Sequence, residues 1–129
     1  MSNATTSNAT AIVDTYIAMW NETDPAKRAE LIERAWTSDG RYLDPQLEAD
    51  GTAAISGMVA AVHERFPGHR FRRVSGVDQH HDQIRFGWEL FAPDGSITVG
   101  GIDIGELASD GRLRRITGFF GPLPEEAAA

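Results

Sequence analysis

Three polar residues, Tyr16, Asp44 and Asp103, occupy positions where their side chains could serve a ligand pocket. Tyr16 lies in the middle of an apolar helical stripe, and a buried tyrosine normally finds a partner for its hydroxyl. Asp44 directly precedes Pro45, which pushes it into an extended conformation and fixes it at a chain corner. Two carboxyls and a phenol are groups that hold protons and donate or accept hydrogen bonds.

Asp103 lies in the segment "ITVGGIDIGEL", which reads as a strand because its period is two. Alternation places it on one face with aliphatic side chains and with Gly101 and Gly105. Glycine inside a strand marks a bulge, a bend or the close approach of another group. A carboxylate beside such a void is what a ligand pocket needs.

Each of the three residues also has a structural interpretation. The Tyr16 hydroxyl could simply reach the surface from an amphipathic helix. Asp44-Pro45 could simply begin a turn, as Asp-Pro usually does. Asp103 could sit at a barrel corner, so the functional interpretation depends on the convergence of all three.

Helical spacing predicts the elements of the first half of the chain. One helix is expected over 9–21, and a second begins with Asp24 as N-cap and Pro25 at the first helical position, with Trp36 on its buried side. A short strand follows at 41–44, with Tyr42 on the same face as Asp44. A third helix is capped by Thr52 and ends at "FPGH".

From His69 onward the period changes to two, and four strands are predicted near 69–79, 83–92, 96–108 and 112–121. "PDG" at 93–95 and "SDGR" at 109–112 are typical hairpin turns. Helices followed by an antiparallel meander indicate an α+β fold with three helices packed on one face of a strongly bent sheet. We expect a flexible leader over 1–9, one domain over 10–121 and a flexible tail over 122–129.

Composition narrows the class of protein. The 129 residues suffice for one domain. The formal net charge of -7 disfavours nucleic acid and anionic membrane surfaces as partners. The absence of cysteine excludes disulfides, zinc-thiolate sites and cysteine nucleophiles. "MSNATTSNAT" lacks the features of a secretory signal and no apolar run reaches membrane-spanning length, so we expect a cytoplasmic protein.

The order of elements, together with "YLDP", "GTAAI", "RFGWEL", "GGID" and "DGRLRRITGFFG", resembles the SnoaL-like branch of the nuclear transport factor 2-like superfamily. This superfamily includes ketosteroid isomerases and polyketide cyclases. The resemblance covers the chain from about Ile12 to Gly121. It implies a cone-shaped α+β fold, in which a bent antiparallel sheet wraps round a long helix and leaves an apolar pocket open at one end.

The similarity to ketosteroid isomerases extends to single residues. It implies that Tyr16 is an oxyanion-hole tyrosine, Asp44 the catalytic base and Asp103 a protonated aspartate. Protein chemists know ketosteroid isomerase as the standard example of a carboxylic acid kept neutral by an apolar site. The implied reaction is proton transfer beside a carbonyl, with neither metal nor organic cofactor.

A pocket in this position implies a set of lining residues, which are Trp20, Val59, Phe86, Trp88, Leu90, Gly101, Gly118 and Phe120. Val59 departs from the isomerase pattern, because some of those enzymes have a supporting tyrosine there. Trp88 is bulky enough to shrink the pocket. His80 and His81 are adjacent, and on a strand they would point to opposite faces and could not bind one metal together.

Three functions remain open from the sequence. The first is a cofactor-free isomerase or cyclase that removes an α-proton from a hydrophobic carbonyl compound. The second is a non-catalytic protein that binds a small apolar ligand. The third is an interaction domain that dimerises through an exposed sheet face; a homodimer is common in this superfamily.

Overall fold

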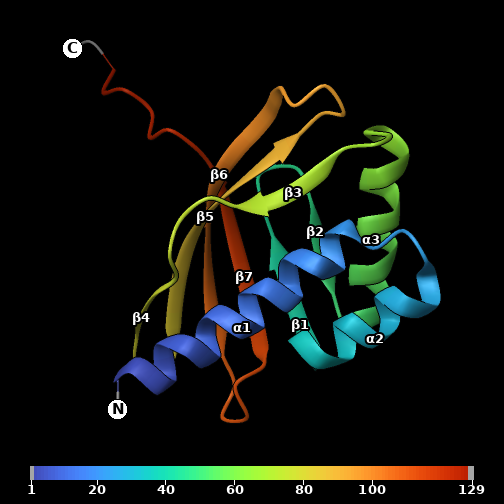
Figure 1. Cartoon of the computed structure of the whole chain (residues 1–129). Coiled ribbons are helices and arrows are strands. Elements are labelled where there is room, and N and C mark those ends of the chain that lie inside the picture. Colours follow the sequence, from blue (N-terminus) through green and yellow to red (C-terminus); the bar gives the residue numbers. More distant parts are fainter. Residues whose placement is uncertain (1, 128–129) are drawn as a thin grey trace.

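The computed structural model describes residues 2–127, and side chains from residue 8 onward. Two helices precede the strands of one curved sheet, and a third helix lies between the second and third strands (Figure 1). The helices are α1 (Ser2–Asn21), α2 (Pro25–Ala35) and α3 (Thr52–Arg65). The strands are β1 (Trp36–Leu43), β2 (Glu48–Asp50), β3 (Arg70–Arg73), β4 (Asp78–His80), β5 (Gln83–Phe91), β6 (Ile97–Leu107) and β7 (Leu113–Phe120).

The seven strands form one sheet in the order β2-β1-β7-β6-β5-β3, and β4 also pairs with β5. All pairings are antiparallel except that of β1 with β7, which is parallel. The expected purely antiparallel sheet is therefore corrected to a mixed one. The predicted α+β architecture, with three helices on a strongly curved sheet, is confirmed.

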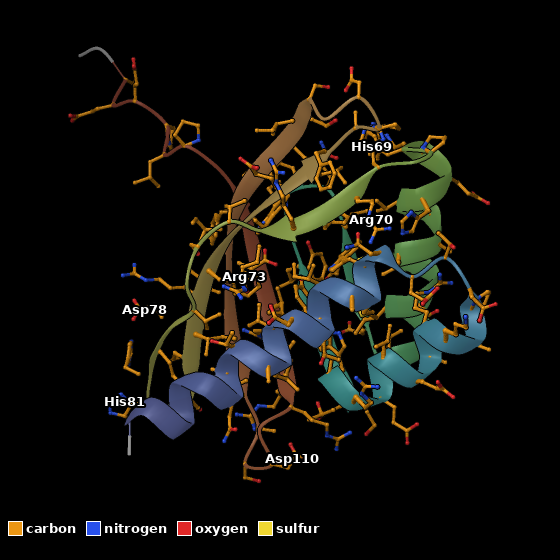
Figure 2. The ribbon with its side chains drawn as sticks, viewed as in Figure 1. His69, Arg70, Arg73, Asp78, His81 and Asp110 are labelled. Carbon is orange, nitrogen blue, oxygen red and sulfur yellow. The ribbon has the colours of Figure 1, made fainter. Side chains whose placement is uncertain are left out.

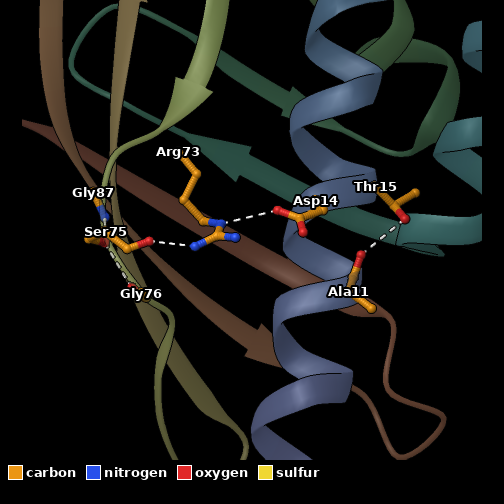
Figure 3. A network of polar contacts seen from close by, with 7 residues as sticks. All are labelled: Ala11, Asp14, Thr15, Arg73, Ser75, Gly76 and Gly87. Atoms are coloured by element: carbon orange, nitrogen blue, oxygen red, sulfur yellow. Dashed lines mark hydrogen bonds and ion pairs between the residues drawn. The ribbon is translucent and has the colours of Figure 1, made fainter.

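Helix α1 crosses the concave side of the sheet (Figure 1). An ion pair ties it to the end of β3, because the Arg73 Nε lies 3.1 Å from Asp14 Oδ1. The same guanidinium donates from Nη1 to the Ser75 carbonyl oxygen at 2.6 Å, and the Ser75 hydroxyl accepts from the Gly87 N–H on β5 (Figure 3). Tyr16, two residues further along α1, contacts Phe86 on β5 and Asp103 on β6.

Several element boundaries differ from the sequence prediction. Helix α1 begins at Ser2 rather than at residue 9, and Trp36 begins β1 instead of continuing α2. The predicted strand over 69–79 is divided into β3 and β4, and β2 was not predicted. The cap of α3 is Gly51 rather than Thr52, because Gly51 adopts a positive φ of 86° and its N–H donates to the Gly40 carbonyl oxygen.

Other local predictions are confirmed. Asp24 caps α2, its side chain accepting from the Lys27 N–H, and Pro25 occupies the first helical position. The hairpin turns use Gly95 and Gly111, each at a φ of 88° that disfavours other residues. None of the helices among the described residues is both long and apolar enough to cross a membrane.

Candidate functional site

Tyr16 is buried in the centre of the fold, with 1% of its surface exposed. Its ring packs edge-on against Trp20, Trp36 and Phe86, with centroids 6.5, 6.0 and 5.9 Å away. Its hydroxyl donates a hydrogen bond of 2.7 Å to Oδ2 of Asp103. The structure therefore brings together the helix tyrosine and the strand aspartate, which lie far apart in the sequence.

Asp103 is buried on the concave face of β6, with 3% of its surface exposed. It lies opposite Gly118 on β7, and a Cβ added to that glycine would come within 2.7 Å of Asp103 Oδ1. The absence of a side chain at Gly118 thus provides the space that the carboxyl occupies. Oδ1 itself is buried without a hydrogen-bond partner.

Burial raises the pKa of Asp103 to about 7. The hydrogen bond from Tyr16 and the nearby indole of Trp88 lower the pKa, and the negative charge of Asp44 raises it. The Trp88 indole faces the carboxyl without forming a hydrogen bond, and its Nε1 is buried without a partner. Burial also raises the pKa of Tyr16, as does the charge of Asp103, so the phenol stays protonated at neutral pH.

Asp44 is half-buried at the corner where β1 ends. Its Oδ1 accepts from the backbone N–H groups of Gln46 and Leu47, each at 2.8 Å, and its Oδ2 accepts from the Tyr42 hydroxyl at 2.7 Å. Three donors therefore fix the orientation of this carboxylate. The turn before Leu47 also explains the corner, because the Asp44 N–H donates to the Leu47 carbonyl oxygen.

Tyr42 is a member of the site that sequence reasoning did not select. Only 4% of its surface is exposed, and burial raises the pKa of its phenol, with the charges of Asp103 and Asp44 adding to the effect. Its hydroxyl lies 3.5 Å from the position of a Cβ on Gly118, and Asp44 Cβ lies 3.3 Å from the same point. The two phenol–carboxyl pairs thus meet at Gly118. The signal was present, since alternation already placed Tyr42 and Asp44 on one face.

The three predicted residues line one cavity of about 240 Å³. Its wall is mainly aromatic and aliphatic, with polar groups from Gln46, Arg65 and Thr98 in addition to the two phenols and two acids. Of the residues expected to line it, Trp20, Trp88, Leu90 and Phe120 do so. Leu47, Phe66 and Phe71 also line it and were not anticipated.

Four residues expected on the cavity wall lie behind it. Val59 and Phe86 are buried in the core, at 0% and 1% exposure, and the Phe86 ring packs against Tyr16. Gly118 lies under the carboxyl of Asp103 rather than on the wall. A Cβ on Gly101 would come within 2.0 Å of the Phe119 carbonyl oxygen, so this glycine permits close strand packing and contributes no lining surface.

The histidine pair lies exposed at the turn between β4 and β5. His80 Nδ1 and His81 Nδ1 lie 3.0 Å apart, because His81 leaves the strand with a positive φ of 53°. His81 lies at the opposite end of the sheet from His69 and far from α3 (Figure 2). No group of three or more side chains that could hold a metal occurs among the described residues.

The comparison with solved structures places this chain in a family. A protein described as a candidate isomerase of the SnoaL-like family, from Agrobacterium tumefaciens, is 36% identical to this chain. The match covers 90% of this chain and 99% of that one, with a TM-score of 0.85. The chain belongs to the SnoaL-like family. No protein-family model matches this SnoaL-like chain, and no curated protein matches it.

Two more distant structures share the fold of this SnoaL-like protein. A nuclear transport factor 2-like protein from Exiguobacterium is 18% identical over 87% of this chain and 99% of that one, with a TM-score of 0.68. A candidate SnoaL-like polyketide cyclase from Jannaschia is 18% identical over 84% of each chain, with a TM-score of 0.63. At this identity the likeness concerns the architecture, so the chemistry must be argued from the site.

Proposed function

We propose that this SnoaL-like protein is a cofactor-free isomerase or cyclase that removes an α-proton from a hydrophobic carbonyl compound. The observation that carries the proposal is the convergence of a buried Tyr16–Asp103 pair and the Asp44 carboxylate on one apolar cavity. One acid is buried and has a pKa raised to about 7, whereas the other is half-buried and held by three donors. Two carboxyls in such different environments suit opposite roles in proton transfer.

In the proposed step, the substrate carbonyl oxygen takes the place of Asp103 Oδ2 as the acceptor for the Tyr16 hydroxyl. Asp44 takes the α-proton, the C–H electron pair forms a carbon–carbon double bond, and negative charge moves to the oxygen. Tyr16 and protonated Asp103 donate hydrogen bonds to this oxygen as the charge develops. Asp44 then returns the proton to another carbon; alternatively the enolate carbon attacks a second carbonyl group, whose π electrons move to its oxygen, and that oxygen takes the proton from Asp44.

The environment of Asp44 agrees with the role of a base. The Tyr42 hydroxyl and the N–H groups of Gln46 and Leu47 donate to this carboxyl and hold it in one orientation. Positioning of a base against its proton is a large part of its effect. The raised pKa of the Tyr42 phenol keeps that hydroxyl a donor rather than a competing base.

Solvent-deuterium exchange tests the proposal directly. Wild-type protein in D₂O is incubated with 2-tetralone and with a β,γ-unsaturated ketosteroid, and deuterium at the α-carbon is followed by NMR. We expect exchange well above the buffer rate with at least one of these ketones. Exchange at the buffer rate with both would favour a non-catalytic binding pocket.

The outer face of the sheet supports a second function, self-association. Ile102, Ile104 and Phe119 are exposed there to 43, 39 and 55%, and Ile102 lies directly opposite Phe119 in the β6–β7 register. Adjacent exposed apolar side chains on a sheet are typical of an interface. We propose that this face forms a homodimer.

Light scattering after size-exclusion chromatography tests the homodimer. Wild-type protein should have twice the mass of one chain, and Ile102→Glu should shift it to the mass of one chain because the interface would bury an unpaired charge. Leu123→Glu is the control, since Leu123 is also an exposed apolar residue, at 91%, but lies beyond the end of β7 and off this face of the sheet. A monomeric wild type would contradict the homodimer.

A further inference from the structure

Arg65 is the cationic side chain among the residues that line the cavity. It lies in the last turn of α3, where a positive charge complements the helix dipole, and its guanidinium lies 5.6 Å from the centroid of the Phe66 ring. Among the side chains of residues 8–127, no carboxylate lies within ion-pairing distance of it. Its donors are therefore free for a ligand.

Arg34, Arg70 and Arg115 also form no ion pair among the described residues, but Arg65 is the arginine that lines the cavity. The arginines that form ion pairs are Arg41, Arg72, Arg73, Arg85, Arg112 and Arg114. Arg28 is buried and satisfied by the Ser56 hydroxyl and the Glu22 carbonyl oxygen. A chain with a net charge of -7 offers many carboxylates, yet none pairs with the arginine beside the cavity.

Contacts place Arg65 at the end of the cavity opposite Asp103. The neighbouring Phe66 ring lies 5.4 Å from the His69 ring, and His69 Nε2 lies 2.9 Å from the Thr98 hydroxyl near the start of β6. Figure 2 places His69 where α3 meets that end of the sheet. Thr98 and Asp103 are five residues apart along β6, which corresponds to about 16 Å.

We propose that the substrate carries a carboxylate, or a similar anionic group, that binds Arg65 at the end opposite its reacting carbonyl. This inference rests on the proposed function for the position of the carbonyl. The apolar body of the substrate lies between the two ends, against Val62, Phe66, Phe71 and Leu90. The anion is kept away from Asp44, whose charge would repel it, and this sets the direction in which the substrate enters.

Binding of a matched pair of probes tests the anionic subsite. Calorimetry with 2-naphthylacetate and its neutral analogue 2-naphthylacetamide compares one apolar body with and without a charge. We expect wild type to bind the carboxylate about fivefold more tightly than the amide, as a partly exposed ion pair allows, and the preference to shrink in high salt. Arg65→Gln should abolish the preference, and Arg65→Lys should keep part of it.

Arg34→Gln is the matched control, because Arg34 also lies exposed in the last turn of a helix but does not line the cavity. It removes the same charge and should keep the preference. Equal affinity of wild type for both probes, a preference that survives Arg65→Gln, or no carboxylate binding at millimolar concentration would overturn the inference. A preference in wild type and in Asp44→Asn, without any deuterium exchange, would retain the anionic subsite and reject the proposed chemistry alone.

Discussion

Replacing Asp44 with asparagine should lower the rate of α-proton exchange by about 10²- to 10⁴-fold, the usual contribution of a general base. The amide has nearly the shape of the carboxylate but cannot accept a proton. Its oxygen can still accept from the N–H groups of Gln46 and Leu47, and the Tyr42 hydroxyl can turn to accept from the introduced amide. Exchange of deuterium into the ketone, followed by NMR, measures the loss.

The matched control for this variant is Asp50→Asn. Asp50 is an exposed aspartate on the neighbouring strand β2, where it pairs with Arg41 at 3.2 Å and does not line the cavity. It should exchange the ketone proton at the wild-type rate. Equal rates for wild type and Asp44→Asn, with near-ultraviolet circular dichroism showing both folded, would remove Asp44 from the mechanism.

Replacing Asp103 with asparagine should stabilise the protein at pH 8 relative to wild type, although it removes a carboxyl from the site. The pKa of Asp103 is raised by burial from 3.8 to about 7. Because the native state then binds more protons than the unfolded state, the stability of wild type falls as pH rises from about 4 to about 7. At higher pH the ionised carboxylate costs roughly 4 kcal/mol, and asparagine avoids this cost.

Urea denaturation at pH 4 to 8 measures this effect as the difference in unfolding free energy between the variant and wild type. The difference should rise with pH and level off above about pH 7. Asp94→Asn is the control, since a hydrogen bond from Ser96 lowers the pKa of this exposed aspartate. The stability that this low pKa contributes is lost only in acid. The difference in unfolding free energy between Asp94→Asn and wild type should therefore stay constant between pH 5 and 8. If the difference in unfolding free energy between Asp103→Asn and wild type did not change with pH, the raised pKa of Asp103 would be contradicted.

The same pKa predicts the direction of the pH dependence of activity. Asp103 can donate a hydrogen bond to the developing oxyanion only while it is protonated, so exchange should slow as pH rises through about 7. In Asp103→Asn the amide remains a donor at every pH in this range. The exchange rate of Asp103→Asn should therefore be lower than that of wild type, but it should not fall as the pH rises through about 7.

The parts of the site that could be predicted from sequence were those with a local signal. Tyr16 interrupts an apolar helical stripe, and Asp103 lies between glycines on the apolar face of a strand, so each needed a polar partner. In the structure Tyr16 and Asp103 are hydrogen-bond partners of each other. Asp44 was located by Pro45, which ends β1 at the corner where the cavity lies.

The parts that could not be predicted depend on contacts distant in sequence. The parallel pairing of β1 with β7 joins the first and last strands of the chain, and no local pattern specifies it. Trp36 fits the helical spacing of α2, yet its burial against Tyr16 occurs from β1. Whether Val59 and Phe86 reach the cavity depends on the curvature of the sheet, which a period of two does not reveal.

The most direct test of the account is the titration of the Asp103 carboxyl carbon by NMR, in protein labelled with ¹³C-aspartate and assigned with Asp103→Asn. The proposed chemistry requires this acid to remain protonated in its apolar surroundings next to Tyr16. It predicts a midpoint at about pH 7, well above the value of 3.8 for an ordinary aspartate. A midpoint near 4 would mean that Asp103 is ionised at neutral pH, which would contradict its role as a hydrogen-bond donor.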